Sequence, residues 1–401
     1  MTVAARFRPF GATIFAEMTA LARTHNAINL SQGFPDFDGP AFVRDAARRA
    51  MDEGHNQYAR LAGEPPLNEA IARSLDRHNG LSVDPHAEIT VTNGCTEALA
   101  AVMLGLIEPG DEVVLFEPFY DSYRACVAMA GATARFVRLS PDAEGRFTFD
   151  AADLRSAISE RTRAIVVNTP HNPTGTVLTR EELECIAAVA RERDLIVVSD
   201  EVYERLTYDG APPHVSIATL PGMRERTITC SSLGKTFSFT GWKIGWAAGP
   251  PQLTAGIRAA HQFLCYAVAT PLQHAAATAL DEGDAAIEEI RATYQARRDE
   301  LVEGLRDLGF RFRPPEGSYF IMADHTPLSE PRGICDDVAF ARELTEHAGV
   351  AVIPPSAFYS QPADGARFVR FAFCKRPETL AAACDRLRRW AEQRSGSLRT
   401  G

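Results

Sequence analysis

Two lysines, Lys235 and Lys243, lie eight residues apart in the segment SSLGKTFSFTGWKIGW, and the chain contains only one other lysine. The neighbours of Lys235 are Leu, Gly, Phe and Trp, and such surroundings disfavour the charged form of an amine. An uncharged amine can attack a carbonyl group and form a Schiff base. Lys243 and Ser232 are instead groups that bind phosphate, one by charge and one by a hydrogen bond. The segment therefore predicts a covalent anchor beside a phosphate site.

A further part of the phosphate site is predicted in the segment TNGCTEAL, which joins a predicted strand to a predicted helix. It places Cys95 or Thr96 near the N-cap of the helix and Glu97 in the first turn. Free backbone N–H groups at a helix start attract anions. Most helix starts of this kind bind nothing, but together with Ser232 and Lys243 this one can complete a phosphate site.

A carboxylate is expected at the end of a buried strand, in the segment VVSDEVYERL. There Asp200 needs a cationic partner, unless it only caps a following helix. A protonated pyridine nitrogen is such a partner, and a pyridoxal enzyme requires one for its ring. Tyr203, three residues later, and Asn172, in HNPTG, could each hydrogen-bond the phenolic oxygen of that ring, although NPTG is also a common turn sequence.

Two arginines late in the chain, Arg367 and Arg370 in RFVRFAFCK, are three residues apart on a predicted edge strand and therefore lie on opposite faces. One should face solvent and the other inward, where a guanidinium can hold a carboxylate through two hydrogen bonds. The spacing alone does not choose between them. The third lysine, Lys375, follows this strand and is expected to face water.

The elements that must position these residues are short apolar runs that alternate with helical stretches. Runs that are apolar on both faces are typical of parallel strands covered by helices, which predicts a doubly wound α/β sheet. Each run ends in polar or loop-forming residues, and ligands of such sheets bind beyond the carboxyl ends of the strands. The predicted strands are 88–93, 111–118, 162–170, 195–201 and 227–232.

Three parts are predicted along the chain. Residues 1–45 form an arm and part of a smaller domain, 46–285 form the large domain, and 286–401 form a small α+β domain. A long charged amphipathic helix marks the start of the last part, because the pattern changes there from short strands to AIEEIRATYQARRDELVEGLRDLG.

Composition argues against several classes of function. A net charge of -10 and the lack of a basic run disfavour nucleic-acid binding. Nowhere do 18 apolar residues follow one another, so we expect no membrane span. The N-terminus also lacks the unbroken apolar core of a signal peptide. The eight cysteines form no CxxC pair, and no histidine is expected near them at metal-ligand spacing, so we expect reduced thiols, a cytoplasmic protein and no metal.

Taken together, these motifs resemble the class I/II aminotransferases of pyridoxal phosphate fold type I, over nearly the whole chain from NLSQGFPDFDGP to RFVRFAFCKRPETL. The resemblance implies an α/β fold with a large domain, whose mostly parallel sheet is sandwiched by helices, and a smaller α+β domain. It also implies pyridoxal 5'-phosphate as cofactor, amino acids and 2-oxo acids as substrates, and a homodimer.

The resemblance assigns a role to each motif residue. Lys235 is implied as the Schiff-base lysine and proton carrier, and Asp200 as the partner of the pyridine nitrogen. The other implied contacts are Tyr203 and Asn172 on the ring hydroxyl, Tyr120 stacked on the ring, Ser232, Lys243, Cys95 and Thr96 around the phosphate, Tyr58 on the phosphate of the neighbouring subunit, and Arg370, Asn172 and Gly33 on the substrate carboxylate.

Within the family, the motifs most resemble the branch of kynurenine and glutamine transaminases, methionine aminotransferases and N-succinyldiaminopimelate aminotransferases. The implied donor has an uncharged or extended side chain: methionine, glutamine, an aromatic or a kynurenine-like amino acid. Phe15, Phe34 and Tyr266 are candidates to line its pocket. Lys243 stands where many relatives have arginine, and no counterpart is evident for a second arginine that would hold a distal carboxylate.

Other activities fit the same residues. One is N-succinyldiaminopimelate transamination, and another is a cysteine-S-conjugate β-lyase, which uses the same lysine but expels a thiol. A ligand-sensing transcription regulator would need a DNA-binding module, which neither the acidic balance nor the motifs indicate. A scaffold that binds nothing is disfavoured because every expected polar ligand is present.

Overall fold

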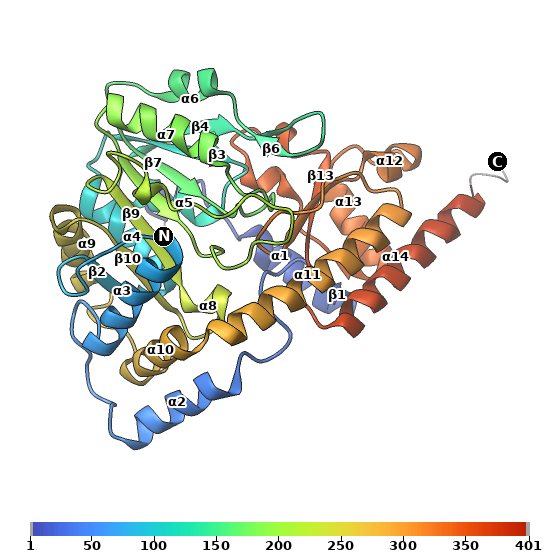
Figure 1. Cartoon of the computed structure of the whole chain (residues 1–401). Coiled ribbons are helices and arrows are strands. Elements are labelled where there is room, and N and C mark those ends of the chain that lie inside the picture. Colours follow the sequence, from blue (N-terminus) through green and yellow to red (C-terminus); the bar gives the residue numbers. More distant parts are fainter. Residues whose placement is uncertain (1–2, 398–401) are drawn as a thin grey trace.

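A seven-stranded sheet forms the centre of the computed structural model, which describes residues 3–397 (Figure 1). The strand order is β2-β10-β9-β8-β7-β3-β4, and every pairing is parallel except those of β10. The predicted α/β fold with a mostly parallel sheet is therefore confirmed. The strands are β2 (Ile89–Asn93), β3 (Glu112–Glu117), β4 (Thr133–Arg138), β7 (Thr162–Asn168), β8 (Ile196–Asp200), β9 (Thr227–Ser232) and β10 (Ile244–Ala248).

Strand β10 was not predicted, and it lies antiparallel between β2 and β9. The segment 233–243 reverses the chain from β9 to β10 at the edge of the sheet, and an antiparallel neighbour needs no crossover helix. Because β2 and β9 are both antiparallel to β10, they point the same way. The carboxyl ends of β2, β9 and the other parallel strands therefore meet at one edge.

Alternation of side chains explains why both faces of this sheet are covered. Val113 and Leu115 of β3 belong to one apolar cluster, whereas Val114 and Phe116 belong to another on the opposite face. The helices around the sheet are α2 (Ala41–Asp52), α3 (Pro65–Asn79), α4 (Gly94–Leu106), α5 (Asp121–Met129), α6 (Ala151–Ala157), α7 (Arg180–Glu192), α9 (Pro251–Leu264) and α10 (Thr270–Glu282).

A second region lies beside the sheet and appears mostly in orange and red (Figure 1). The N-terminal segment joins both regions, because β1 (Ile28–Asn29) pairs with β12 of this region whereas α2 packs on α10. The elements of the second region are α1 (Ile14–Thr24), α11 (Asp284–Asp307), β11 (Phe320–Asp324), α12 (Thr326–Ser329), α13 (Asp337–Glu343), β12 (Val350–Ala351), β13 (Phe368–Ala372) and α14 (Pro377–Ser397).

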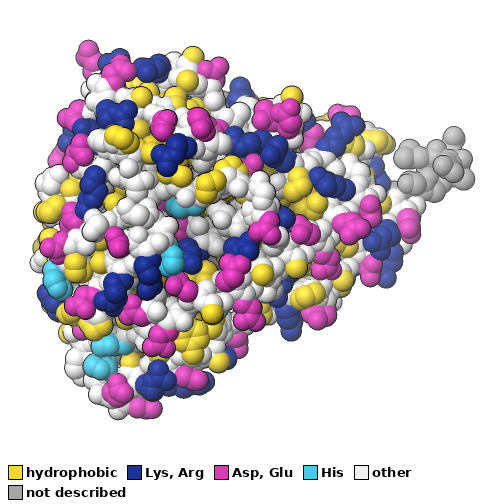
Figure 2. Space-filling view, viewed as in Figure 1, with side chains coloured by type: hydrophobic (Ala, Val, Ile, Leu, Met, Phe, Trp, Pro, Cys, Tyr) yellow, Lys and Arg dark blue, Asp and Glu magenta, His cyan; other side chains and the backbone are white. Residues whose placement is uncertain are grey.

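The surface carries acidic and basic side chains close together over the face shown in Figure 2. Within residues 3–397, no helix combines the length and the apolar character needed to cross a membrane.

The crossing of α4 and α9 depends on two glycines that let the helices touch. A Cβ on Gly105 would lie 2.3 Å from the carbonyl oxygen of Gly256, and a Cβ on Gly256 would lie 2.6 Å from that of Gly105. Both obstacles are backbone atoms, so no side chain can move aside to make room.

We predict that Gly105→Ala forces these helices apart and lowers the free energy of unfolding by about 1–3 kcal/mol, the usual cost of overpacking. Thermal unfolding followed by circular dichroism measures the change. Gly11→Ala is the matched control, because no atom lies within 4 Å of a Cβ built there. Equal midpoints for the two variants would contradict the prediction.

Candidate active site

A cavity of about 290 Å³ lies at the carboxyl edge of the sheet. Loops that follow β2, β3, β7, β8 and β9 all reach it, together with residues of the second region. The convergence predicted from the strand ends is thus present. Among the lining residues are Gly33, Phe34, Cys95, Thr96, Tyr120, Tyr123, Asn168, Asn172, Asp200, Tyr203, Ser232, Lys235, Lys243, Phe320 and Arg370.

Lys235 lies on a single helical turn, α8 (Leu233–Thr236), directly after β9. Its amine lies 5.9 Å from the ring centre of Tyr203 and 5.6 Å from that of Tyr319. Burial lowers the pKa of this amine to about 8. About one-tenth of the amine is therefore uncharged at pH 7, and this is the form that acts as a nucleophile.

Asp200 is the last residue of β8 and is buried. Its carboxylate accepts hydrogen bonds from the Tyr123 hydroxyl at 2.7 Å and from the Val202 backbone N–H at 3.3 Å. Burial raises its pKa, which these hydrogen bonds offset in part. Among the described residues no cationic side chain forms an ion pair with it, so a protonated ring nitrogen in the cavity fits the partner that this carboxylate lacks.

Two residues of this site were missed in the sequence. Tyr123 bonds the carboxylate of Asp200, and the side-chain amide of Asn168 donates to the backbone carbonyl of Asp200 at 2.9 Å. The amide oxygen of Asn168 also accepts from the backbone N–H of Asn172 at 2.8 Å. Asn168 is a polar residue at the carboxyl end of a strand, so the rule that found Asp200 could have found it too.

The residues predicted to bind phosphate lie around the start of α4. This helix begins at Gly94 with Asn93 as N-cap, so Cys95 and Thr96 lie in its first turn, near the N-cap as expected. The ammonium group of Lys243 lies close to this helix start, since a Cβ on Gly94 would lie 3.2 Å from its Nζ. Free N–H groups and an ammonium group thus face the same place, which suits a phosphate.

Arg370 is the inward arginine, with 1% of its surface exposed. It donates to the side-chain oxygen of Asn172 at 3.0 Å and to the carbonyl of Ser31 at 2.9 Å. Burial lowers its pKa to about 10. Arg367 points the other way, to an ion pair with Asp324, so the structure makes the choice that the strand pattern left open. A buried guanidinium with no acidic partner in contact among the described residues is suited to a carboxylate ligand.

Lys375 does not face water, and that expectation is wrong. It is buried, and its Nζ donates to the backbone carbonyl of Phe34 at 2.7 Å and lies 4.7 Å from the Phe34 ring centre. The neighbouring carbonyl of Gly33 accepts from the Tyr319 hydroxyl at 2.6 Å. The second region therefore fixes the loop that forms one wall of the cavity.

The aromatic candidates divide into two groups. Tyr120, Phe15 and Phe34 line the cavity. Tyr58 is 90% exposed and packs edge-on against Tyr266 at 5.8 Å, and neither of these two lines the cavity of the single chain. The expectation that Tyr266 lines the side-chain pocket is therefore not met within one chain.

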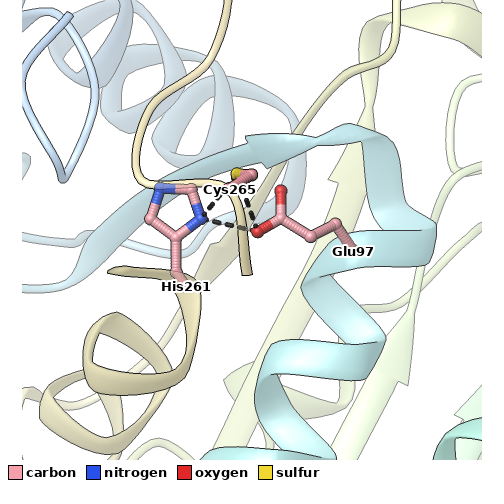
Figure 3. Close-up of side chains that lie close together, drawn as sticks. All are labelled: Glu97, His261 and Cys265. Carbon is pink, nitrogen blue, oxygen red and sulfur yellow. Dashed lines mark hydrogen bonds and ion pairs between the residues drawn. The ribbon is translucent and has the colours of Figure 1, made fainter. Parts of the chain in front are cut away.

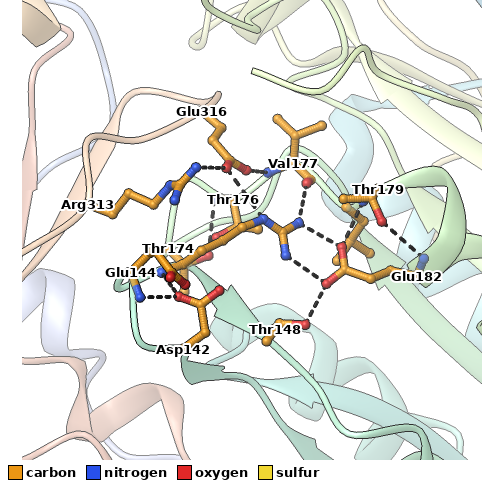
Figure 4. A network of polar contacts seen from close by, with 12 residues as sticks. Asp142, Glu144, Thr148, Thr174, Thr176, Val177, Thr179, Glu182, Arg313 and Glu316 are labelled. Atoms are coloured by element: carbon orange, nitrogen blue, oxygen red, sulfur yellow. Dashed lines mark hydrogen bonds and ion pairs between the residues drawn. The ribbon is translucent and has the colours of Figure 1, made fainter. Parts of the chain in front are cut away.

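A polar network outside the cavity holds the loop that carries Asn172 (Figure 4). Arg146 donates to Glu182 at 2.7 Å and lies 3.4 Å from Glu316. Glu316 accepts from the Val177 backbone N–H at 3.0 Å, and its own backbone N–H donates to the carbonyl of Gly175 at 2.9 Å. The part of this loop that leads into α7 is thus fixed by partly or fully buried charges.

Comparison with known proteins gives concordant results. Residues 25–387 match the family model for aminotransferase class I and II. The chain is 50% identical to a probable N-succinyldiaminopimelate aminotransferase of Mycobacterium tuberculosis, over 98% of this chain and 99% of the relative. It is 40% identical to a methionine aminotransferase of Escherichia coli, over 94% and 96%.

Solved structures agree. The N-succinyldiaminopimelate aminotransferase of M. tuberculosis matches with a TM-score of 0.93 and 49% identity, over 97% of this chain and all of that one. A lysine beside a phosphate site, a buried carboxylate without a cation and an inward arginine are also what transamination on pyridoxal phosphate needs. The chain therefore belongs to the class I and II aminotransferase family and is a pyridoxal phosphate-dependent enzyme.

Proposed function

We propose that this enzyme transfers the amino group of an L-amino acid with an uncharged or extended side chain to a 2-oxo acid. The observation that carries the proposal is the unequal distribution of charge in the cavity. Among the described residues, three cationic ones line it. Lys235 and Lys243 are predicted to bind the cofactor, which leaves Arg370 for the substrate. Its other walls include the aromatic rings of Phe15 and Phe34, which favour an apolar or long side chain.

The α-carboxylate of the substrate is proposed to bind Arg370, Asn172 and the backbone of Gly33. Arg370 and Asn172 are already hydrogen-bonded to each other, so both are oriented before a ligand arrives. Gly33 is confined by the ring of Phe320, since a Cβ there would lie 2.7 Å from it. Only glycine therefore fits at this position without displacing the ring.

Lys235 is proposed to hold the cofactor covalently and then to move the proton of the substrate α-carbon. Pyridoxal phosphate, when bound, supplies an electron-withdrawing ring. Asp200 would hold the ring nitrogen protonated, while Tyr203 and Asn172 would bond the ring hydroxyl. Tyr120 would stack on the ring. Ser232, Lys243, Cys95 and Thr96 would hold the phosphate.

A homodimer is the proposed assembly. Tyr58 is nearly fully exposed although it is a large aromatic residue, and Phe263, in the last turn of α9, is 85% exposed. In a dimer Tyr58 would reach the cofactor phosphate of the partner. We also propose the cytoplasm as its compartment, where its eight free cysteines remain reduced.

N-Succinyldiaminopimelate is the second candidate donor, favoured by the 50% identity to the M. tuberculosis relative. We expect one donor among methionine, glutamine, phenylalanine, kynurenine and N-succinyldiaminopimelate to give a kcat/KM at least about tenfold above that of aspartate, because the short side chain of aspartate would hold its carboxylate against the apolar rings of Phe15 and Phe34. Stopped-flow absorbance of the bound cofactor measures each half-reaction. Aspartate as the best donor would refute the proposal.

Exchange of the inward arginine tests the carboxylate site. Arg370→Lys should lower kcat/KM about 100-fold or more, because a single ammonium cannot reproduce the paired hydrogen bonds of a buried guanidinium. Arg367→Lys is the matched control on the outer face and should stay within about twofold. Steady-state kinetics with the best donor measures both, and similar losses in the two variants would contradict the assignment.

The pH dependence of cofactor attachment tests Lys235. Since burial lowers the pKa of its amine to about 8, covalent uptake of pyridoxal phosphate by the apoenzyme should accelerate roughly tenfold per pH unit below that value and level off above it. Borohydride trapping and mass spectrometry measure the attached fraction. Lys235→Ala should trap none, and a rate that still rises steeply above pH 9 would show that the amine keeps its ordinary pKa.

A further inference from the structure

Three side chains with metal-binding atoms lie close together beside the start of α4, where the phosphate-binding residues are predicted. They are Glu97 in the first turn of α4, His261 in the last turn of α9, and Cys265 directly after α9 (Figure 3). The sequence expectation that no histidine lies near a cysteine at ligand spacing is therefore wrong. His261 and Cys265 are four residues apart, so the end of the helix brings them to the same side, and the fold adds Glu97 from another helix.

The distances among the three atoms are close to those of a zinc site. Glu97 Oε1 lies 2.6 Å from His261 Nδ1 and 3.2 Å from Cys265 Sγ, and Sγ lies 3.5 Å from Nδ1. Tetrahedral zinc, with bonds of about 2.0–2.3 Å, separates its ligand atoms by about 3.3–3.6 Å. The Sγ–Nδ1 separation of 3.5 Å lies in this range, and the Oε1–Sγ separation of 3.2 Å is just below it. The larger change is in the Glu97–His261 contact, which must lengthen by less than about 1 Å.

The surroundings hold the ligands in place. His261 is fully buried, and its Nε2 has no hydrogen-bond partner among the described residues, so Nδ1 makes the only polar contacts of the ring. Glu97 is fixed through its other oxygen, which accepts from the Asn93 backbone N–H at 2.5 Å. Cys265 is partly exposed, which leaves a path for an ion and room for a water ligand.

A second cluster, formed by Glu201, Glu204 and His214, lacks these properties. Each of its carboxylate oxygens already accepts a hydrogen bond, for example from Ser216 and from Asn79. Binding a metal there would break several buried hydrogen bonds, which makes the first cluster the better site.

We propose that Glu97, His261 and Cys265 form a binding site for a zinc-class divalent ion. One nitrogen, one oxygen and one sulfur ligand favour zinc over magnesium or calcium, which prefer oxygen alone. Binding releases the proton of the Cys265 thiol to solvent and leaves the imidazole proton of His261 on Nε2, so that the thiolate, the carboxylate and the lone pair of Nδ1 bond the metal. The ion ties the end of α9 to the first turn of α4, where Cys95 and Thr96 face the cofactor phosphate site.

The test uses the full-length holoenzyme, stripped with a chelator and titrated with zinc chloride against a chromophoric zinc indicator. Wild type should bind about one zinc per chain. Cys265→Ser and His261→Gln should lose more than about 100-fold in affinity, because even outer partners of a metal ligand are worth about 10- to 100-fold. Cys335→Ser is the matched control, since Cys335 is the exposed cysteine, and it should bind zinc as wild type does.

Equal zinc affinity in wild type and Cys265→Ser would overturn the proposal, as would a folded wild type that retains no zinc. Circular dichroism of the zinc-free variants shows whether they are folded. If a variant is not folded, cadmium replaces zinc in wild type: thiolate-to-cadmium absorption, lost on alkylation of Cys265, supports the site, and its absence overturns it.

Discussion

The site depends on a carboxylate that the fold buries without a cation. Asp200 closes the most central of the parallel strands, and burial alone would make its charged form costly. The chain offsets part of this cost with the Tyr123 hydroxyl and the Val202 N–H, each of which requires a particular placement of its own loop. The remaining cost is removed when a cationic ring binds, so the site is organised around a partner that the chain itself does not supply.

Arg370 shows the same principle with the opposite charge. Its contacts in the chain are neutral oxygens, those of Asn172 and Ser31, and it packs over the ring of Phe320 at 4.1 Å. The guanidinium is therefore held in place without being neutralised. Two buried charges of opposite sign, kept apart by the cavity, attract a ligand that carries both complements, and a cofactor with an amino acid bound to it does so.

The sequence indicated the residues whose signal is local. Lys235, Asp200 and Asn172 follow strand ends, and the strand pattern found five of the seven strands of the central sheet. Strand β10 was missed because Gly and Trp in KIGWAA read as part of the lysine motif. The contacts of Tyr123 with Asp200 and of Lys375 with Phe34 join segments that only the folded chain brings together, so no spacing rule could reveal them. The i, i+4 spacing of His261 and Cys265 was visible in the sequence, but their contact with Glu97 was not.

The position of Lys375 explains why a chain rich in arginine uses lysine there. The pocket beneath Phe34 offers one carbonyl oxygen and the face of one ring. An ammonium group has three donors on one nitrogen atom, and its charge can make a cation–π contact with the ring. A guanidinium has five donors spread over a larger plane, and those left without partners in this buried position would each carry a desolvation cost. The small head group therefore lets the second region hold the backbone of Phe34, a residue of the cavity wall, through one hydrogen bond.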